Sequence, residues 1–275
     1  MPPIHIALLS EVEDIGASAL QRLAAAIQHQ LSDHLGPAWD VVATIHSFSA
    51  SEDVPLDWWR VTLGWEVPNQ PDLSGAHTDG LGNPAAFVDW SKGVWTANVS
   101  HEILEMLVDP TGRRTIEGPS IMPGQDLVQY LVEVCDPCQA PDFYYQIDGQ
   151  RLSTFCLPAF YDPNSSGQCF FKSKWTRPLS VARGGYLSWQ ESGTQEWWQQ
   201  TWFSGSVARF EMRGVSPQTG SVRYWIDSHH PLGHSVARVR AQQRKLSDEC
   251  RAANLRLRSN ARRVEKHFRK LREAN

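Results

Sequence analysis

One short segment of the chain combines residue types and a spacing that suit metal chemistry. In Asn98–Pro110, NVSHEILEMLVDP, His101 and Glu105 are separated by one helical turn in sequence. On a helix this spacing places both side chains on one face, where they could share a cation. Glu102 follows His101 directly, so its carboxylate could reach a water bound to that cation. We therefore take His101 and Glu105 as candidate metal ligands and Glu102 as a candidate general base.

The motif departs from the commonest form of this geometry. Zinc peptidases usually carry HExxH, whereas here Glu105 stands in place of the second histidine. A carboxylate is an accepted zinc ligand, so the pattern still suits zinc. The competing interpretation is a solvated helix face with a chance His–Glu pair. An enclosed face is favoured instead by the apolar neighbours, Ile103, Leu104, Leu107 and Val108. Buried carboxylates without a partner are costly, and a cation would compensate them.

A third ligand is expected downstream, in the segment LVEVCDP at Leu131–Pro137. This segment offers two carboxylates, Glu133 and Asp136, flanked by apolar residues. Glu133 follows Glu105 at a workable distance for a chain that returns to the metal. The sequence leaves open which of the two is the ligand. It also leaves open that the segment is only a strand followed by a turn that Asp136 caps.

The chain also shows the elements that must position these residues. Strands are predicted at four places: Ile4–Ser10, Trp39–Phe48, Asp57–Val67 and Ala85–Trp90. Helices are predicted at Ile15–Leu35, which Gly36-Pro37 should end, and at Thr96–Val108, which Asp109-Pro110 ends. The segment Pro68–Asn83 is rich in turn formers, so it is predicted to be a loop.

The remaining body of the chain is predicted to be mostly β. Thr111–Gln125 has no clear pattern, and Asp126–Glu211 alternates short β-like pieces with turns. The order of elements predicts an α+β domain over residues 1–233. His229, His230 and His234 form a second histidine cluster, but the proline and glycine among them argue against a helix. We therefore predict a hinge loop there.

The C-terminal segment, residues 234–275, differs from this body in charge. It holds 13 of the 26 Lys and Arg of the chain but only 4 of the 30 Asp and Glu. Apolar or small residues recur in it at alternating steps of three and four, which is the coiled-coil pattern. We predict a long basic helix that forms a coiled coil or bundle, with a helix packed on its own body as the alternative.

The expected partners follow from this helix. We expect homo-oligomers, or docking on an acidic protein, through residues 234–275. Nucleic acid is a weaker expectation, because Phe268 is the one aromatic residue of the segment and base stacking needs more of them. The sequence has no run of about 18 apolar residues, so no membrane span is predicted. Without a signal peptide, the expected location is the cytoplasm or a virion.

The cysteines offer a competing metal site. Cys135 and Cys138, with Cys156 and Cys169, lack the spacing of a zinc ribbon, so free thiols in a reducing compartment are predicted.

Amide hydrolysis would also need a group that stabilises the oxyanion. The candidates for that role carry a hydroxyl or an imidazole: Tyr144, Tyr145, Tyr161 and the pair His229-His230.

The strand AAFVDW, the helix HEILEMLVDP and a later acidic ligand together resemble zincin-type metallopeptidases. The segments SHEILEMLVDP, EVCDP, YQIDGQRLSTFCLPAFYDP and PLSVARGGYLSW look more closely like an uncharacterised group of bacterial and phage-associated HExxE proteins. This resemblance runs from about Ile4 to Trp189. It implies a zincin-like domain with a mixed sheet and an active-site helix.

The resemblance also implies roles for individual residues. These are zinc ligands at His101 and Glu105, a general base at Glu102, and an acidic ligand at Glu133 or Asp136. The function expected from it is that of a zinc-dependent peptidase acting on peptides or proteins, either alone or inside a larger assembly. The alternative is a non-catalytic assembly protein that has a structural metal site and oligomerises through its basic helix.

Overall fold

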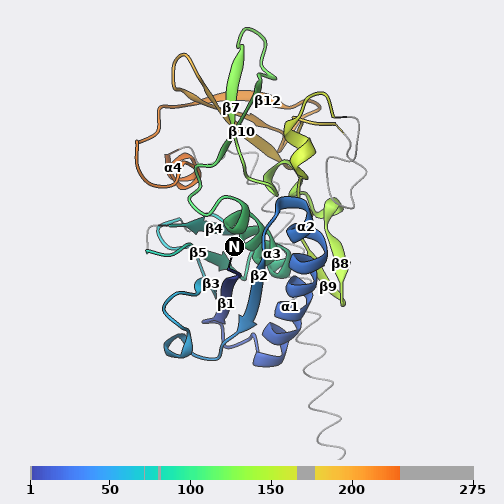
Figure 1. Cartoon of the computed structure of the whole chain (residues 1–275), viewed down its shortest axis with the longest axis vertical. Helices are drawn as coiled ribbons and strands as arrows, with labels where there is room; N and C mark the ends of the chain where they lie inside the picture. Colours follow the sequence, from blue (N-terminus) through green and yellow to red (C-terminus); the bar gives the residue numbers. More distant parts are fainter. Residues whose placement is uncertain (1, 71, 80–81, 166–176, 230–275) are drawn as a thin grey trace, which may run out of the picture.

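The computed structural model describes residues 2–70, 72–79, 82–165 and 177–229, which contain two separate five-stranded sheets (Figure 1). The first sheet has the order β2-β1-β3-β5-β4. Its strands are β1 (Ile4–Ser10), β2 (Ala43–Ser47), β3 (Trp59–Gly64), β4 (Gly75–Thr78) and β5 (Ala85–Asp89). All neighbouring pairs are parallel except β4 and β5, so the sheet is mixed and β4 is its antiparallel edge.

Two helices pack on one face of this sheet, α1 (Ala17–Gln30) and α3 (Trp95–Val108). The strand β1 is apolar on both sides, because Ile6 and Leu8 face the helices while Ala7 and Leu9 face Val54 behind the sheet. A strand covered on both faces has a nearly continuous apolar sequence. The strands predicted at Ile4–Ser10 and Ala85–Trp90 and the helix predicted at Thr96–Val108 are thus confirmed within a residue.

The predicted end of the first helix is wrong. After α1 the chain continues through a π-helical turn, Leu31–Leu35, into the short helix α2 (Gly36–Trp39). Pro37 lies in the first turn of α2. Trp39, which was predicted to begin a strand, ends this helix, and its Nε1–H donates to the Cys156 carbonyl at 3.0 Å.

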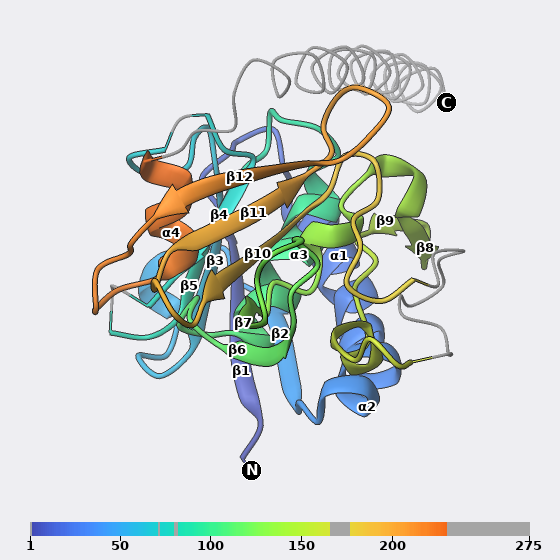
Figure 2. The same ribbon diagram turned by 90° about the horizontal axis from the view of Figure 1, so that it is seen from above.

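The second sheet is antiparallel throughout and has the order β12-β11-β10-β7-β6. Its strands are β6 (Thr115–Pro119), β7 (Leu127–Leu131), β10 (Tyr186–Glu191), β11 (Trp197–Thr201) and β12 (Arg209–Gly214). It lies above the first sheet in Figure 1, and Figure 2 shows β10, β11 and β12 side by side from above. Between β7 and β10 lies the hairpin of β8 (Tyr145–Ile147) and β9 (Gln150–Leu152).

Two segments predicted to be irregular contain strands. Pro68–Asn83 includes β4, and Thr111–Gln125 includes β6. Both strands are short and rich in turn formers, so they have little β signal of their own. Each is stabilised by an antiparallel neighbour, β5 or β7, which a local pattern does not reveal.

The predicted fold class is wrong. A zincin-like domain followed by a long C-terminal helix does not describe a chain with two five-stranded sheets, which is mixed α+β at most. The last described element is the eight-residue helix α4 (Val222–His229), so His229 lies in a helix instead of a hinge loop. The coiled coil rested on a heptad pattern alone, and residues 234–275 lie outside the described residues. The domain boundary at 233 stays a prediction.

Among the described residues, no helix combines the length and the apolar character that crossing a membrane requires.

The tight turn at Gly36 gives a stability prediction. A Cβ there would lie 2.7 Å from the Val41 carbonyl oxygen and 2.8 Å from that of Leu31, and both contacts are with backbone. We expect Gly36→Ala to lower the free energy of unfolding by about 1–3 kcal/mol, as overpacking does. Gly193→Ala is the matched control, since its Cβ would meet nothing within 4 Å. Equal urea midpoints for the two variants would show that this turn is not tightly packed.

Candidate metal centre

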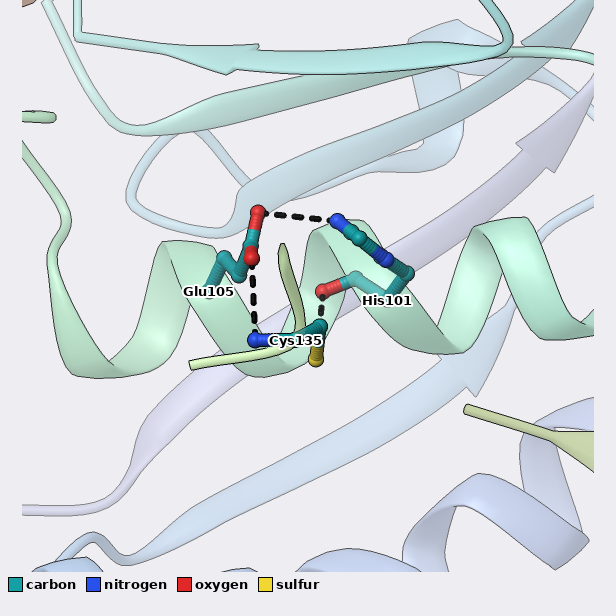
Figure 3. A group of neighbouring side chains, drawn as sticks. All are labelled: His101, Glu105 and Cys135. Atoms are coloured by element: carbon teal, nitrogen blue, oxygen red, sulfur yellow. Dashed lines mark hydrogen bonds and ion pairs between the residues drawn. The ribbon is translucent and has the colours of Figure 1, made fainter. Parts of the chain in front are cut away.

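Helix α3 presents His101 and Glu105 toward the loop that follows β7. His101 Nε2 lies 3.1 Å from Glu105 Oε2 and 3.4 Å from Asp136 Oδ1. Glu105 Oε1 accepts the backbone N–H groups of Cys135 at 3.0 Å and Asp136 at 3.1 Å, as Figure 3 shows for Cys135. The loop therefore holds the Glu105 carboxylate in place from the side opposite His101.

The other oxygen of Asp136 faces helix α4. Arg223 Nε lies 3.3 Å from Asp136 Oδ2, and Arg223 Nη1 donates to Asp227 Oδ1 at 2.6 Å. The guanidinium also lies over the Tyr186 ring, 4.7 Å from its centroid, and contacts the Tyr186 hydroxyl. Arg223 thus links α4 to both the second sheet and the carboxylate that approaches His101.

Glu133 and His77 lie on the other side of Glu105. Glu133 is 3% exposed, and neither of its carboxylate oxygens has a hydrogen-bond partner among the described residues. His77, on β4, donates its Nε2–H to the Asp109 carbonyl at 3.1 Å, because a carbonyl can only accept. Its Nδ1 lies 3.7 Å from Glu102 Oε2, which is too long for a hydrogen bond.

Glu102 lies against the edge strand and does not face Asp136. A Cβ at position 75 would come within 2.8 Å of three Glu102 side-chain atoms, so only glycine fits on β4 at this point. The three acidic and basic residues of the motif therefore point to two sides: His101 toward Asp136, Glu102 toward His77, and Glu105 between them.

Burial and neighbouring charges oppose each other in this cluster. Burial alone would raise the pKa of Glu105, but His101 outweighs it and lowers the pKa to about 2. Burial would lower the pKa of His101, but Glu105 and Asp136 raise it well above its ordinary value. Burial raises the pKa of Asp136 to about 6 although Arg223 opposes it. Burial, reinforced by Glu105, also raises the pKa of Glu133 well above its ordinary range.

Two sets of side chains bring three ligand atoms within 4.8 Å of one another. One is His101, Glu105 and Cys135, and the other is His77, Glu105 and Glu133. Burial raises the pKa of the Cys135 thiol well above its ordinary value, and a metal binds thiolate. Cys135 and Asp136 are therefore alternative third ligands beside His101 and Glu105.

The five predicted site residues thus lie in one region of the molecule, although they divide between two sides of Glu105. Of the oxyanion candidates, Tyr161 is buried and its hydroxyl has no hydrogen-bond partner in the described chain. Tyr145 accepts a hydrogen bond from Gln30, and His229 is bonded to the Trp225 carbonyl at the exposed end of α4. Tyr145 and His229 therefore do not suit that role, and His230 lies outside the described residues. Tyr144 is half-buried; burial raises its pKa, and the charge of His101 opposes this rise.

Cys135 and Cys138 are free thiols and, like Cys156, are buried, whereas Cys169 and Cys250 lie outside the described residues. His77 and Arg223 were not predicted from the sequence. His77 sits in a segment read as a loop, so nothing placed it beside α3. For Arg223 a signal was available, since Arg223 and Asp227 have the spacing of a helical ion pair.

Comparison of the chain with protein-family models, with curated proteins and with solved structures found no match. The resemblance to metallopeptidases therefore stays a prediction from the sequence motifs.

The buried ion pairs of Arg223 give a prediction that needs no metal. Replacing Arg223 with Met leaves the carboxylates of Asp136 and Asp227 without their cation. We expect the free energy of unfolding to fall by about 3–5 kcal/mol, as it does when one partner of a buried pair is removed. Chemical denaturation at neutral pH would measure it. Arg209→Met, at an exposed position of β12, is the control. A loss no larger than that of the control would contradict the structural role of Arg223.

Proposed function

We propose that this chain is a zinc-dependent hydrolase that cleaves peptide bonds, with His101, Glu105 and Asp136 as its zinc ligands. The observation that supports this most directly is the spacing around His101 Nε2, which lies 3.1 Å from one carboxylate oxygen and 3.4 Å from another. Ligands at about 2.0–2.1 Å from a tetrahedral zinc lie about 3.3 Å from one another. His101 Nε2 therefore has a zinc-like separation from each of the two carboxylates. Glu105 and Asp136 would have to approach each other to share the ion, because the group of ligand atoms within 4.8 Å joins His101 and Glu105 with Cys135 instead.

The donor set also suits zinc chemistry. One imidazole and two carboxylates are accepted zinc ligands, and a site with three protein ligands keeps a position open for water. The oxygens of Asp136 are buried and have charged neighbours but no partner with hydrogen-bond geometry in the described residues. A cation between His101 and the carboxylates would compensate this burial.

The chain's own residues would divide the remaining work. A bound zinc ion would supply an activated water and polarise the substrate carbonyl. Glu102, which lies beside His77, would have to turn toward the zinc-bound water to take its proton and pass it to the leaving amine. His77 Nδ1 lies 3.7 Å from Glu102 Oε2. Arg223 would orient Asp136, in the way that outer partners commonly fix metal ligands.

The edge strand beside Glu102 supports a peptide as the substrate. β4 ends the first sheet, and Gly75 brings its backbone against Glu102. An extended peptide can add to such an edge through backbone hydrogen bonds. A scissile bond held there would lie next to the proposed general base.

A second function, a structural metal site in an assembly protein, is favoured by one observation. The side chains of Glu105 and Asp136 are only 2% and 1% exposed, and that of His101 is 13% exposed. A site so enclosed suits an ion that stabilises the fold. The two proposals differ in the open coordination position, which a hydrolase needs and a structural site lacks.

The substitution Glu102→Gln separates the two functions. We expect the variant to keep the zinc content of the wild type, because Glu102 is not a ligand of this ion, and to lose about 10²–10⁴-fold in hydrolysis. Zinc would be measured by plasma mass spectrometry and hydrolysis with a quenched peptide library. Glu52→Gln, at an exposed position of the turn Ser51–Asp53, is the control.

The other outcomes are equally informative. Zinc-loaded wild type that cleaves no peptide, together with a melting temperature that falls when zinc is removed, would favour the structural function. Wild type that binds no zinc after incubation with it would contradict both.

A further inference from the structure

We propose that the chain has a second divalent-cation site formed by His77, Glu105 and Glu133, so that Glu105 bridges two ions. This inference rests on the proposed zinc site at His101, with which it shares Glu105. The three residues come from β4, from α3 and from the loop after β7. All three are buried, and their ligand atoms lie within 4.8 Å of one another.

The tautomer of His77 leaves Nδ1 as the ring nitrogen that could bind a cation. Its Nε2 must carry a proton, since the Asp109 carbonyl oxygen 3.1 Å away can only accept. In the neutral ring the lone pair is therefore on Nδ1, the atom that faces the Glu102 carboxylate at 3.7 Å. The Nδ1 position can therefore hold either a proton, as in the ion pair with Glu102, or a metal ion. Metal-binding histidines typically donate their other ring N–H to a carbonyl or carboxylate, which His77 does.

The second argument is the isolated carboxylate of Glu133. Both of its oxygens are buried and without a hydrogen-bond partner in the part of the chain that is described. Buried carboxylates in native proteins are almost always hydrogen-bonded, paired or bound to metal. Glu133 is not needed by the proposed zinc site, where Asp136 is the acidic ligand. An ion shared with His77 and Glu105 gives it a partner.

The third argument is the ability of Glu105 to serve both sites. A carboxylate has about four lone-pair positions. Two N–H groups of the loop occupy Oε1, and Oε2 points toward His101 at 3.1 Å, so positions remain for a second ion. The two backbone donors fix the plane of the carboxylate, as is common for metal ligands.

The charge of the cluster agrees with two ions. The buried carboxylates in and around the cluster belong to Glu102, Glu105, Asp109, Glu133, Asp136 and Asp227. Arg223 is shared between Asp136 and Asp227, so its single positive charge does not balance both. The remaining negative charge exceeds what one divalent ion would compensate. An imidazole nitrogen with carboxylate oxygens suits Zn²⁺ and Mn²⁺, and hydrolases hold such pairs of ions about 3.5–4 Å apart.

The test is the metal content of the full chain, with single substitutions on either side of Glu105. We expect about two Zn²⁺ per wild-type chain, about one after His77→Gln and about one after His101→Gln. Glutamine keeps an amide N–H that can replace the bond from His77 to the Asp109 carbonyl. Loaded with Mn²⁺, the wild type should give the spectrum of a spin-coupled pair, and both variants the spectrum of isolated ions.

Two further variants distinguish the loss of a metal site from a loss of the fold. His29→Gln changes an exposed histidine of α1 that pairs with Asp33, and it should keep both ions. Glu133→Gln is nearly isosteric, so a variant that keeps the wild-type circular dichroism and binds one ion would support the second site independently.

The remaining outcomes identify which proposal fails. One ion that is lost in His101→Gln and kept in His77→Gln overturns the second site and leaves the proposed function standing. One ion that is lost only in His77→Gln overturns the two-ion site and places the metal away from the proposed zinc ligands. A wild type that binds no ion overturns both proposals.

Discussion

The burial of several carboxylates in one region is the constraint on which the rest of this structure depends. Moving an ionised carboxylate out of water costs several kcal/mol unless donors or cations compensate it. Glu105 receives two backbone N–H groups. His101 Nε2 and Arg223 Nε lie beside the two oxygens of Asp136, and Glu133 receives no hydrogen bond from the described residues. The cluster is therefore only partly compensated by the chain itself, and this incomplete compensation is what favours metal binding.

The two sheets supply opposite parts of this cluster. The first sheet positions α3 and contributes His77 from its edge strand β4, while the second sheet contributes the loop after β7 (Figure 1). Helix α4 follows β12, the last strand of the second sheet, and returns Arg223 to Asp136. Because neither sheet holds a complete set of ligands, the site exists only when the two are packed together. Metal binding and the packing of the sheets should therefore stabilise each other.

The local part of this arrangement could be predicted from the sequence, and the long-range part could not. The helix with His101 and Glu105 has an apolar pattern and a clear end at Asp109-Pro110, so its bounds were predicted closely. The carboxylates of LVEVCDP stood out because they interrupt an apolar run. His77 did not, since the strand that carries it depends on pairing with β5. Most of the second sheet lies in a region that was predicted to be mostly β, but the order and pairing of its strands were not predicted, because they depend on contacts between segments far apart in the sequence. The long terminal helix was predicted from a heptad pattern without any tertiary contact to support it.

The central claim is that His101 shares an ion with carboxylates and not with the neighbouring thiol of Cys135. X-ray absorption at the zinc edge, on the full chain loaded with zinc, tests this most directly. We predict that the zinc ion is surrounded by nitrogen and oxygen atoms only, at about 2.0–2.1 Å. A sulfur atom at about 2.3 Å would contradict it, because the ion would then be held by the Cys135 thiolate in place of Asp136.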